Sequence, residues 1–321
     1  MNLPLQFCAA ALAATCCLPA LGQSYPLRPI RVVVPFSPGA GTDAISRILA
    51  QRLSESLGQQ LVVENRPGAG GTIGTEIVAR APGDGYTLLF APAAHAINPS
   101  IYPRLGYDIE RDLVTIAVAA SLPVVLAVES SVPAKSVAEL VALAKSEPGK
   151  LTMASAGNGT VFHLTGELFK AAAGVHIVHV PFKGGAPAMA ALVGGQVSMA
   201  FETSLTIAPH VKSGKLRGLA VASEGRIAIL PEVPTLAQAG YPGILAENWY
   251  GLYAPAGTPK EVLARLHADL SRALADTDTR QKLAAQGAET RNLTSEQSAA
   301  FVRAEIAKWA RVVKESGARI D

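Results

Sequence analysis

Cysteine is scarce and confined to one end of the sequence. The 321 residues contain three cysteines, Cys8, Cys16 and Cys17, and none follows them. A disulfide framework, a thiolate metal site and a cysteine nucleophile each need cysteine in the folded chain. All three are excluded if the first 22 residues are removed.

An excess of charge of one sign is also lacking, since 28 Lys and Arg stand against 25 Asp and Glu. Aromatic residues make up only 5% of the chain, and no basic run is interleaved with them as a nucleic-acid groove requires. We therefore expect no nucleic-acid partner. Beyond the N-terminus, no apolar run reaches the roughly 18 uncharged residues of a transmembrane helix.

Recognisable catalytic motifs are missing as well. The sequence contains no Gly-x-Ser-x-Gly elbow, Walker loop or His-Glu-x-x-His run. His176 and His179 lie three apart in an expected strand, so their side chains point to opposite faces and a shared metal is not expected. No catalytic base is identified. We expect a binding protein rather than an enzyme, with no metal and no cofactor.

The first 22 residues carry no charge and include the apolar run 7–21, which ends in Ala20-Leu21-Gly22. A small-x-small ending after an apolar run is typical of a signal-peptidase site. Residues 1–22 are therefore predicted to be a signal peptide, and the mature protein is predicted to be exported and soluble. Two alternatives remain, a short membrane anchor and lipid attachment at Cys16 or Cys17.

The full sequence is 49% hydrophobic. After the first 22 residues, the chain alternates short β-branched runs with helical patterns. This order predicts an α/β fold with parallel strands covered by helices. A second such unit begins beyond the apolar runs at 114–119 and 124–128. The last part of the chain predicts only helices, at 259–275, 279–286 and 294–316, and these helices must pack on a sheet formed earlier in the chain. We expect a first domain of residues 24–123 plus 245–321 and a second of residues 124–244.

Each expected domain has a glycine-rich turn between a strand and a helix, at residues 39–44 and 155–160. Such turns present free backbone N–H groups and the positive end of a helix at the carboxyl edge of the sheet. If the domains face each other there, the cleft binds anions, and a small carboxylate fits best. Asp43 is expected to cap its helix and fix the first turn rather than contact the anion.

The first turn also matches a dinucleotide-binding fingerprint, with Glu64 at a distance that suits a ribose. Pro35 and Pro38 stiffen the loop, and Asp43 places a negative charge where a pyrophosphate would lie. An exported NAD-binding oxidoreductase or hydrolase is therefore kept as the alternative function.

Seven segments in order resemble the motifs of one family, the Bug-type solute-binding proteins of tripartite tricarboxylate transporters. They lie at residues 35–43, 65–71, 163–169, 179–184, 194–197, 214–217 and 254–259. The resemblance implies a periplasmic receptor of the two-domain periplasmic-binding-protein-like type II fold, with mainly parallel sheets and two crossover strands as a hinge. It further implies a monomer that binds a small carboxylate and works with membrane transporter subunits or a sensor protein.

Carried over position by position, the resemblance implies three groups of ligand-binding residues. The first-domain loop supplies Phe36, Ser37, Gly41, Thr42 and Asp43, the second-domain loop supplies Ala156, Gly157, Gly159 and Thr160, and the flanking wall supplies His95, Phe182, Lys183 and Glu202. Two positions depart from the family pattern. Ala40 stands where a second glycine is common, and Glu202 stands where an aspartate is usual.

Overall fold

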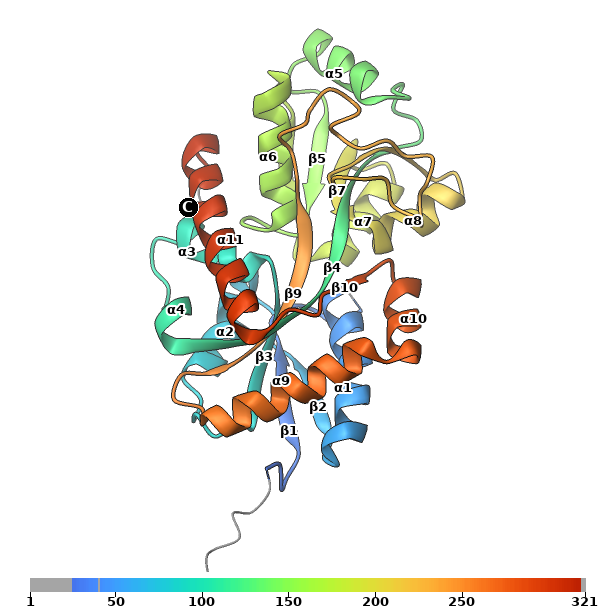
Figure 1. The fold of residues 1–321 in the computed structure, drawn as a ribbon. Helices are drawn as coiled ribbons and strands as arrows, with labels where there is room; N and C mark the ends of the chain where they lie inside the picture. Colours follow the sequence, from blue (N-terminus) through green and yellow to red (C-terminus); the bar gives the residue numbers. More distant parts are fainter. Residues whose placement is uncertain (1–24, 40, 319–321) are drawn as a thin grey trace, which may run out of the picture.

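The computed structural model describes residues 25–39 and 41–318. The expected signal peptide, residues 1–22, and Ala40 lie outside this described part. The described chain is an α/β fold of two lobes joined by long strands, one lobe above the other in Figure 1. The predicted fold class is confirmed. Within the described residues, no helix is long and apolar enough to cross a membrane.

The sheet of the first lobe combines parallel and antiparallel strands. Its parallel part has the order β2-β1-β3, with bounds β1 (Ile30–Val34), β2 (Leu61–Asn65) and β3 (Thr87–Pro92). β9 (Glu247–Pro255) is antiparallel to β3, and β4 (Leu113–Glu129) is antiparallel to β9. The two-residue β10 (Glu289–Thr290) pairs with β4. The sheet is mixed rather than mainly parallel because β4 and β9 run in opposite directions at the junction of the lobes.

Helices cover both faces of this sheet. Ile30, Val32 and Val34 of β1 share one core with the helices α1 (Gly41–Leu57), α9 (Lys260–Ala275) and α10 (Thr277–Ala285). Val33 points to the other face, as strand alternation requires. There it shares a core with α2 (Thr72–Ala79), α3 (Ala94–Ile101) and α11 (Ser295–Ser316). The short η1 (Ala69–Gly71) and α4 (Ile109–Asp112) lie in the connections.

The second lobe repeats this plan on a smaller scale. Its parallel strands have the order β7-β5-β6, with bounds β5 (Thr152–Ser155), β6 (Val178–Pro181) and β7 (Met199–Thr203). β8 (Leu216–Val221) pairs antiparallel with β4. One face packs on α5 (Val137–Ser146) and α6 (Val161–Ala173), and the other on α7 (Gly185–Val193) and α8 (Ser204–Lys212).

β4 connects the lobes as a single strand, although its sequence suggests two apolar runs. Its first part, as far as Pro123, pairs with β9, and its second part, from Val124, pairs with β7 and β8. Pro123, which has no N–H to donate, is the last residue of β4 paired with β9. β4 and β9 therefore occupy the junction of the lobes, where Figure 1 shows them side by side.

Candidate ligand-binding site

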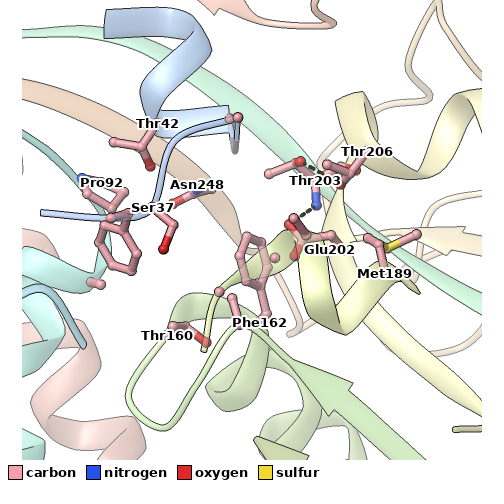
Figure 2. A pocket seen from close by; sticks show the side chains of 18 of the residues that line it. Ser37, Thr42, Pro92, Thr160, Phe162, Met189, Glu202, Thr203, Thr206 and Asn248 are labelled. Carbon is pink, nitrogen blue, oxygen red and sulfur yellow. Dashed lines mark hydrogen bonds between the residues drawn. The ribbon is translucent and has the colours of Figure 1, made fainter. Parts of the chain in front are cut away.

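A cavity of about 140 Å³, partly open to solvent, lies between the lobes. Figure 2 shows side chains from both lobes converging on it. The first lobe contributes Phe36, Ser37, Pro38, Gly39, Gly41, Thr42, Pro92, Ala94, Asn248 and Tyr250. The second contributes Ala156, Thr160, Val161, Phe162, Gly184, Gly185, Ala186, Pro187, Met189, Glu202, Thr203, Thr206 and His210.

Five helices begin at this cavity. Their first turns or N-caps place the lining residues Gly41 (α1), Ala94 (α3), Thr160 (α6), Gly185 (α7) and Thr203 (α8) on its wall. The first N–H groups of a helix have no partner within the helix, and the helix dipole makes that end positive. Side chains cap neither α7 nor α8. The cavity therefore offers backbone donors from both lobes to a negative group.

The described part of the chain places no lysine or arginine on the cavity wall. A carboxylate bound there would be held by backbone N–H groups and hydroxyl groups, without an ion pair. Because these donors are fixed by the strand-to-helix turns, they are already oriented before a ligand arrives.

Asp43 fixes the first-lobe loop from behind. Its carboxylate accepts hydrogen bonds from the Gly39 N–H, the Asn65 amide and the Arg47 guanidinium, all at 3.0 Å. Burial acts to raise the pKa of Asp43, but these hydrogen bonds outweigh it and hold the pKa below its ordinary value. α1 begins at Gly41, so the expectation that Asp43 is the N-cap residue is wrong. Its side chain lies in the first turn and does not line the cavity.

Two side chains of β9 form the floor between the loops. The Asn248 amide donates to the Tyr250 hydroxyl at 2.9 Å, and both residues are buried. The Tyr250 hydroxyl lies so close to Gly41 that a Cβ added there would be 3.0 Å from it. A glycine at this position therefore lets the start of α1 approach β9.

The second-lobe loop is held by its own hydrogen bonds. The Gly157 N–H donates to Ser155 Oγ at 3.2 Å, and the Gly159 N–H donates to His163 Nδ1 at 3.3 Å. Ser155 Oγ also lies 2.7 Å from Nε2 of His179, whose ring stacks on that of His163 with centroids 4.1 Å apart. Burial lowers the pKa of His179 to about 4. These histidines support the loop.

His176 lies apart from this pair, before β6, next to Gly149. No group of three or more His, Cys, Asp or Glu that could hold a metal occurs among the residues described.

Glu202 is the one carboxyl group on the cavity wall in the described chain. It lies near the end of β7 with 4% of its surface exposed, and its Oε1 accepts the Thr203 N–H at 2.8 Å. Burial raises the pKa of this carboxyl to about 7, although the hydrogen bond from Thr203 opposes the shift. Glu202 also raises the pKa of Tyr250, after the larger effect of burial on that hydroxyl.

The predicted site residues divide into three groups by position. The cavity wall includes Phe36, Ser37, Gly41, Thr42, Ala156, Thr160 and Glu202. An adjoining groove of about 570 Å³ is lined by Gly157, Phe182 and Lys183, and it shares Phe36, Ser37, Ala156 and Gly184 with the cavity. Asp43, His95 and Gly159 line neither space.

His95 lies in the core behind Ala94. Only 2% of its surface is exposed, and its ring packs 4.6 Å from that of Tyr253 and 6.5 Å from that of Tyr107, centroid to centroid. Neither ring nitrogen has a hydrogen-bond partner, and burial lowers the pKa of His95 to about 3. The histidine is held neutral, and it is a packing residue rather than part of the wall.

Sequence reasoning missed the wall residues of β9, α7 and α8. Tyr250 lies within the expected strand 249–254 and Asn248 directly before it, and neither position was marked as a site residue. Gly184-Gly185 before a helix and Thr203-Ser204 after a strand are signals of helix starts, and both could have been used in the same way as the two glycine-rich turns.

The dinucleotide-binding alternative requires Glu64 to accept a ribose hydroxyl, but this carboxylate is already engaged. The Glu64 carboxylate pairs with both Arg31 and Arg66, which lower its pKa together. A carboxylate engaged with two guanidinium groups is poorly placed to accept a ribose hydroxyl.

Two lobes joined by crossing strands, with an anion-binding cavity between them, define a solute-binding protein. The profile of the tripartite tricarboxylate transporter family receptor matches residues 45–318. The chain belongs to that family.

Solved structures of similar proteins share the whole fold. The periplasmic binding protein BugD is 36% identical, with a TM-score of 0.86, and the match covers 92% of this chain and 100% of BugD. Rpa4515 of R. palustris, solved with adipate, is 37% identical, with a TM-score of 0.88 and coverage of 92% and 100%. MatC of Rhodopseudomonas palustris, with bound malate, is 34% identical, with a TM-score of 0.85 and coverage of 90% and 100%.

Proposed function

We propose that the protein is a periplasmic receptor that captures a small dicarboxylate between its lobes, without chemical conversion, and presents it to membrane transporter subunits or to a sensor protein. The observation that carries this proposal is the meeting of helix N-termini from both lobes on one cavity, whose wall holds no lysine or arginine among the described residues. Relatives that bind adipate and malate support the ligand class.

The energetics are sufficient for this role. A charge-assisted hydrogen bond contributes about 2 kcal/mol, so four of them contribute about 8 kcal/mol before association costs. Micromolar binding requires about 8 kcal/mol after association costs. Burial of the ligand's carbon chain supplies part of the free energy that offsets those costs.

Binding between two lobes also explains how capture is reported. We propose that the units 24–123 plus 245–321 and 124–244 rotate about β4 and β9. A ligand that contacts both units stabilises the closed form relative to the open one by its contacts with the second lobe. The receptor acts as a monomer in this proposal, because one chain supplies both halves of the cavity.

Thermal unfolding of the purified mature protein with and without ligand tests the proposal. Malate, adipate and succinate are compared with NAD, each at the same concentration, and native mass spectrometry identifies any acid that remains bound after purification. We expect stabilisation by at least one dicarboxylate and none by NAD. Stabilisation by NAD alone, or conversion of a bound acid to product, would support the oxidoreductase or hydrolase instead.

A further inference from the structure

Glu202 occupies an unusual position for a carboxyl group. It lies on the wall of a cavity built to attract anions, and Figure 2 shows its side chain pointing toward the space beside Phe162 and Thr203. Oε1 is engaged by the Thr203 N–H. The other oxygen, Oε2, lies beside Gly185, where an added Cβ would be 2.9 Å from it. Because Oε1 accepts the Thr203 N–H, Oε2 is the oxygen left to face a ligand.

Charged and titratable groups around Glu202 are few. β9 contributes the Tyr250 hydroxyl and α8 contributes His210. α7 has no titratable residue in its sequence, and the start of α6 contributes Thr160, Val161 and Phe162. The residue paired with Glu202 on β4, Val125, is apolar. No lysine or arginine in the described chain lines the cavity, so an ionised Glu202 has no cation to pair with.

An anionic ligand makes the ionised state still less favourable. Two negative groups in one buried space repel each other, and removing both from water adds a further cost. A neutral carboxylic acid in the same place has an O–H group, which is a donor to a carboxylate oxygen.

We propose that Glu202 recognises the ligand as a neutral acid, donating a hydrogen bond from Oε2 to an oxygen of the bound dicarboxylate. The inference rests on the proposed carboxylate-binding function and specifies how the same site selects its ligand. Only a hydrogen bond forms, and the proton stays on Oε2. Whenever Glu202 is ionised in the empty receptor, binding takes this proton from solvent.

This role also sets the ligand class. The ligand atom that faces Glu202 is a hydrogen-bond acceptor, so a carboxylate or hydroxyl oxygen fits there and an ammonium group at that position gains nothing. A 2-amino dicarboxylate such as aspartate is therefore expected to bind more weakly than malate. The pKa of about 7 caused by burial agrees with a neutral group near neutral pH, and a bound anion raises that pKa further.

Titration calorimetry with malate at about pH 6.5 and about pH 8.5 tests the inference. For a group of pKa about 7 that must be protonated in the complex, affinity falls about 25-fold between these two pH values. Repeating the titrations in buffers of different ionisation enthalpy measures the protons taken up, which are expected to approach one per malate at the higher pH.

Three proteins are compared. Glu202→Gln keeps a donor without a titratable group, so its affinity for malate, whatever its absolute value, is expected to change less than threefold between the two pH values. Glu55→Gln removes an exposed carboxylate whose side chain is 53% accessible, at a distance along α1 from the cavity, and is expected to behave like the wild type. A pH dependence that persists in Glu202→Gln would arise from another group and overturn the inference.

Two further results would overturn it: wild-type affinity that is unchanged or rises at the higher pH, or tighter binding of aspartate than of malate. If neither malate nor adipate binds the wild type at either pH, the proposed function itself has failed. Binding without the pH dependence rejects only the role of Glu202.

Discussion

Replacing Glu202 by glutamine is expected to stabilise the ligand-free protein, and to do so only at higher pH. Burial raises the pKa of Glu202 from 4.5 in its ordinary state to about 7 in the fold. The folded chain therefore holds this proton more tightly than the unfolded chain. The contribution of the Glu202 carboxyl group to the unfolding free energy is greatest below pH 4.5, falls as pH rises, and reaches its lowest value above about pH 7.

The magnitude follows from the shift. A difference of roughly 2.5 pKa units corresponds to about 3 kcal/mol of unfolding free energy. Glutamine has no such titration and keeps a similar shape. Relative to the wild type, Glu202→Gln is expected to gain on the order of 3 kcal/mol between about pH 4.5 and about pH 8.5, because the other groups titrate equally in both proteins.

Urea unfolding at these two pH values, followed by circular dichroism, measures the difference. Glu55→Gln is the matched control, since its carboxylate is exposed beside Arg52, and it is expected to show no such gain. A gain for Glu202→Gln that is the same at both pH values would refute the reasoning, because it would show that Glu202 does not change its proton affinity on folding.

Four other substitutions test separate parts of the structure. Between about pH 7 and pH 5, His95→Leu is expected to lose about 2 kcal/mol less unfolding free energy than the wild type. The reason is that this histidine is protonated in the unfolded chain and stays neutral in the fold. Urea unfolding at both pH values measures the difference. Asp43→Asn is expected to cost about 2 kcal/mol of stability through weaker hydrogen bonds to the first loop while largely preserving malate affinity; complete loss of calorimetric binding would show that the carboxylate has a direct role. Gly41→Ala and Gly185→Ala each add a methyl group to the cavity, one from each lobe, and each is expected to weaken malate binding at least tenfold, an estimate from about 1.4 kcal/mol of lost fit. Gly243→Ala, where the methyl group meets open space, is the control, and an unchanged affinity in either cavity variant would argue against contact with that lobe.

The general architecture could be predicted because it is written in local patterns. Strand and helix periodicities alternate along the chain, and the Thr294-Gln297 capping box forms as its sequence indicates. The direction of β4 and β9 could not be read in this way, because a buried strand has the same apolar pattern whether its neighbours are parallel or antiparallel. Continuity of β4 through Pro123 depends on the exchange of partner strands at that point.

Sequence patterns predicted the cavity-lining residues of the strand-to-helix turns and missed those that reach the cavity through packing. The turns before α1 and α6 can be recognised in the sequence by their glycines. Asn248 and Tyr250 reach the cavity only because β9 crosses between the lobes. His95 was misplaced for the converse reason. Its neighbour Ala94 lines the cavity, but the helical turn directs the histidine ring into the core.

A crystal structure of the protein with malate shows whether both lobes hold one small dicarboxylate at once. We expect malate between the starts of α1 and α6, with its oxygens in hydrogen-bond contact with backbone N–H groups of both lobes and with Oε2 of Glu202. Malate bound to a single lobe, or in the adjoining groove beside Lys183, would contradict it.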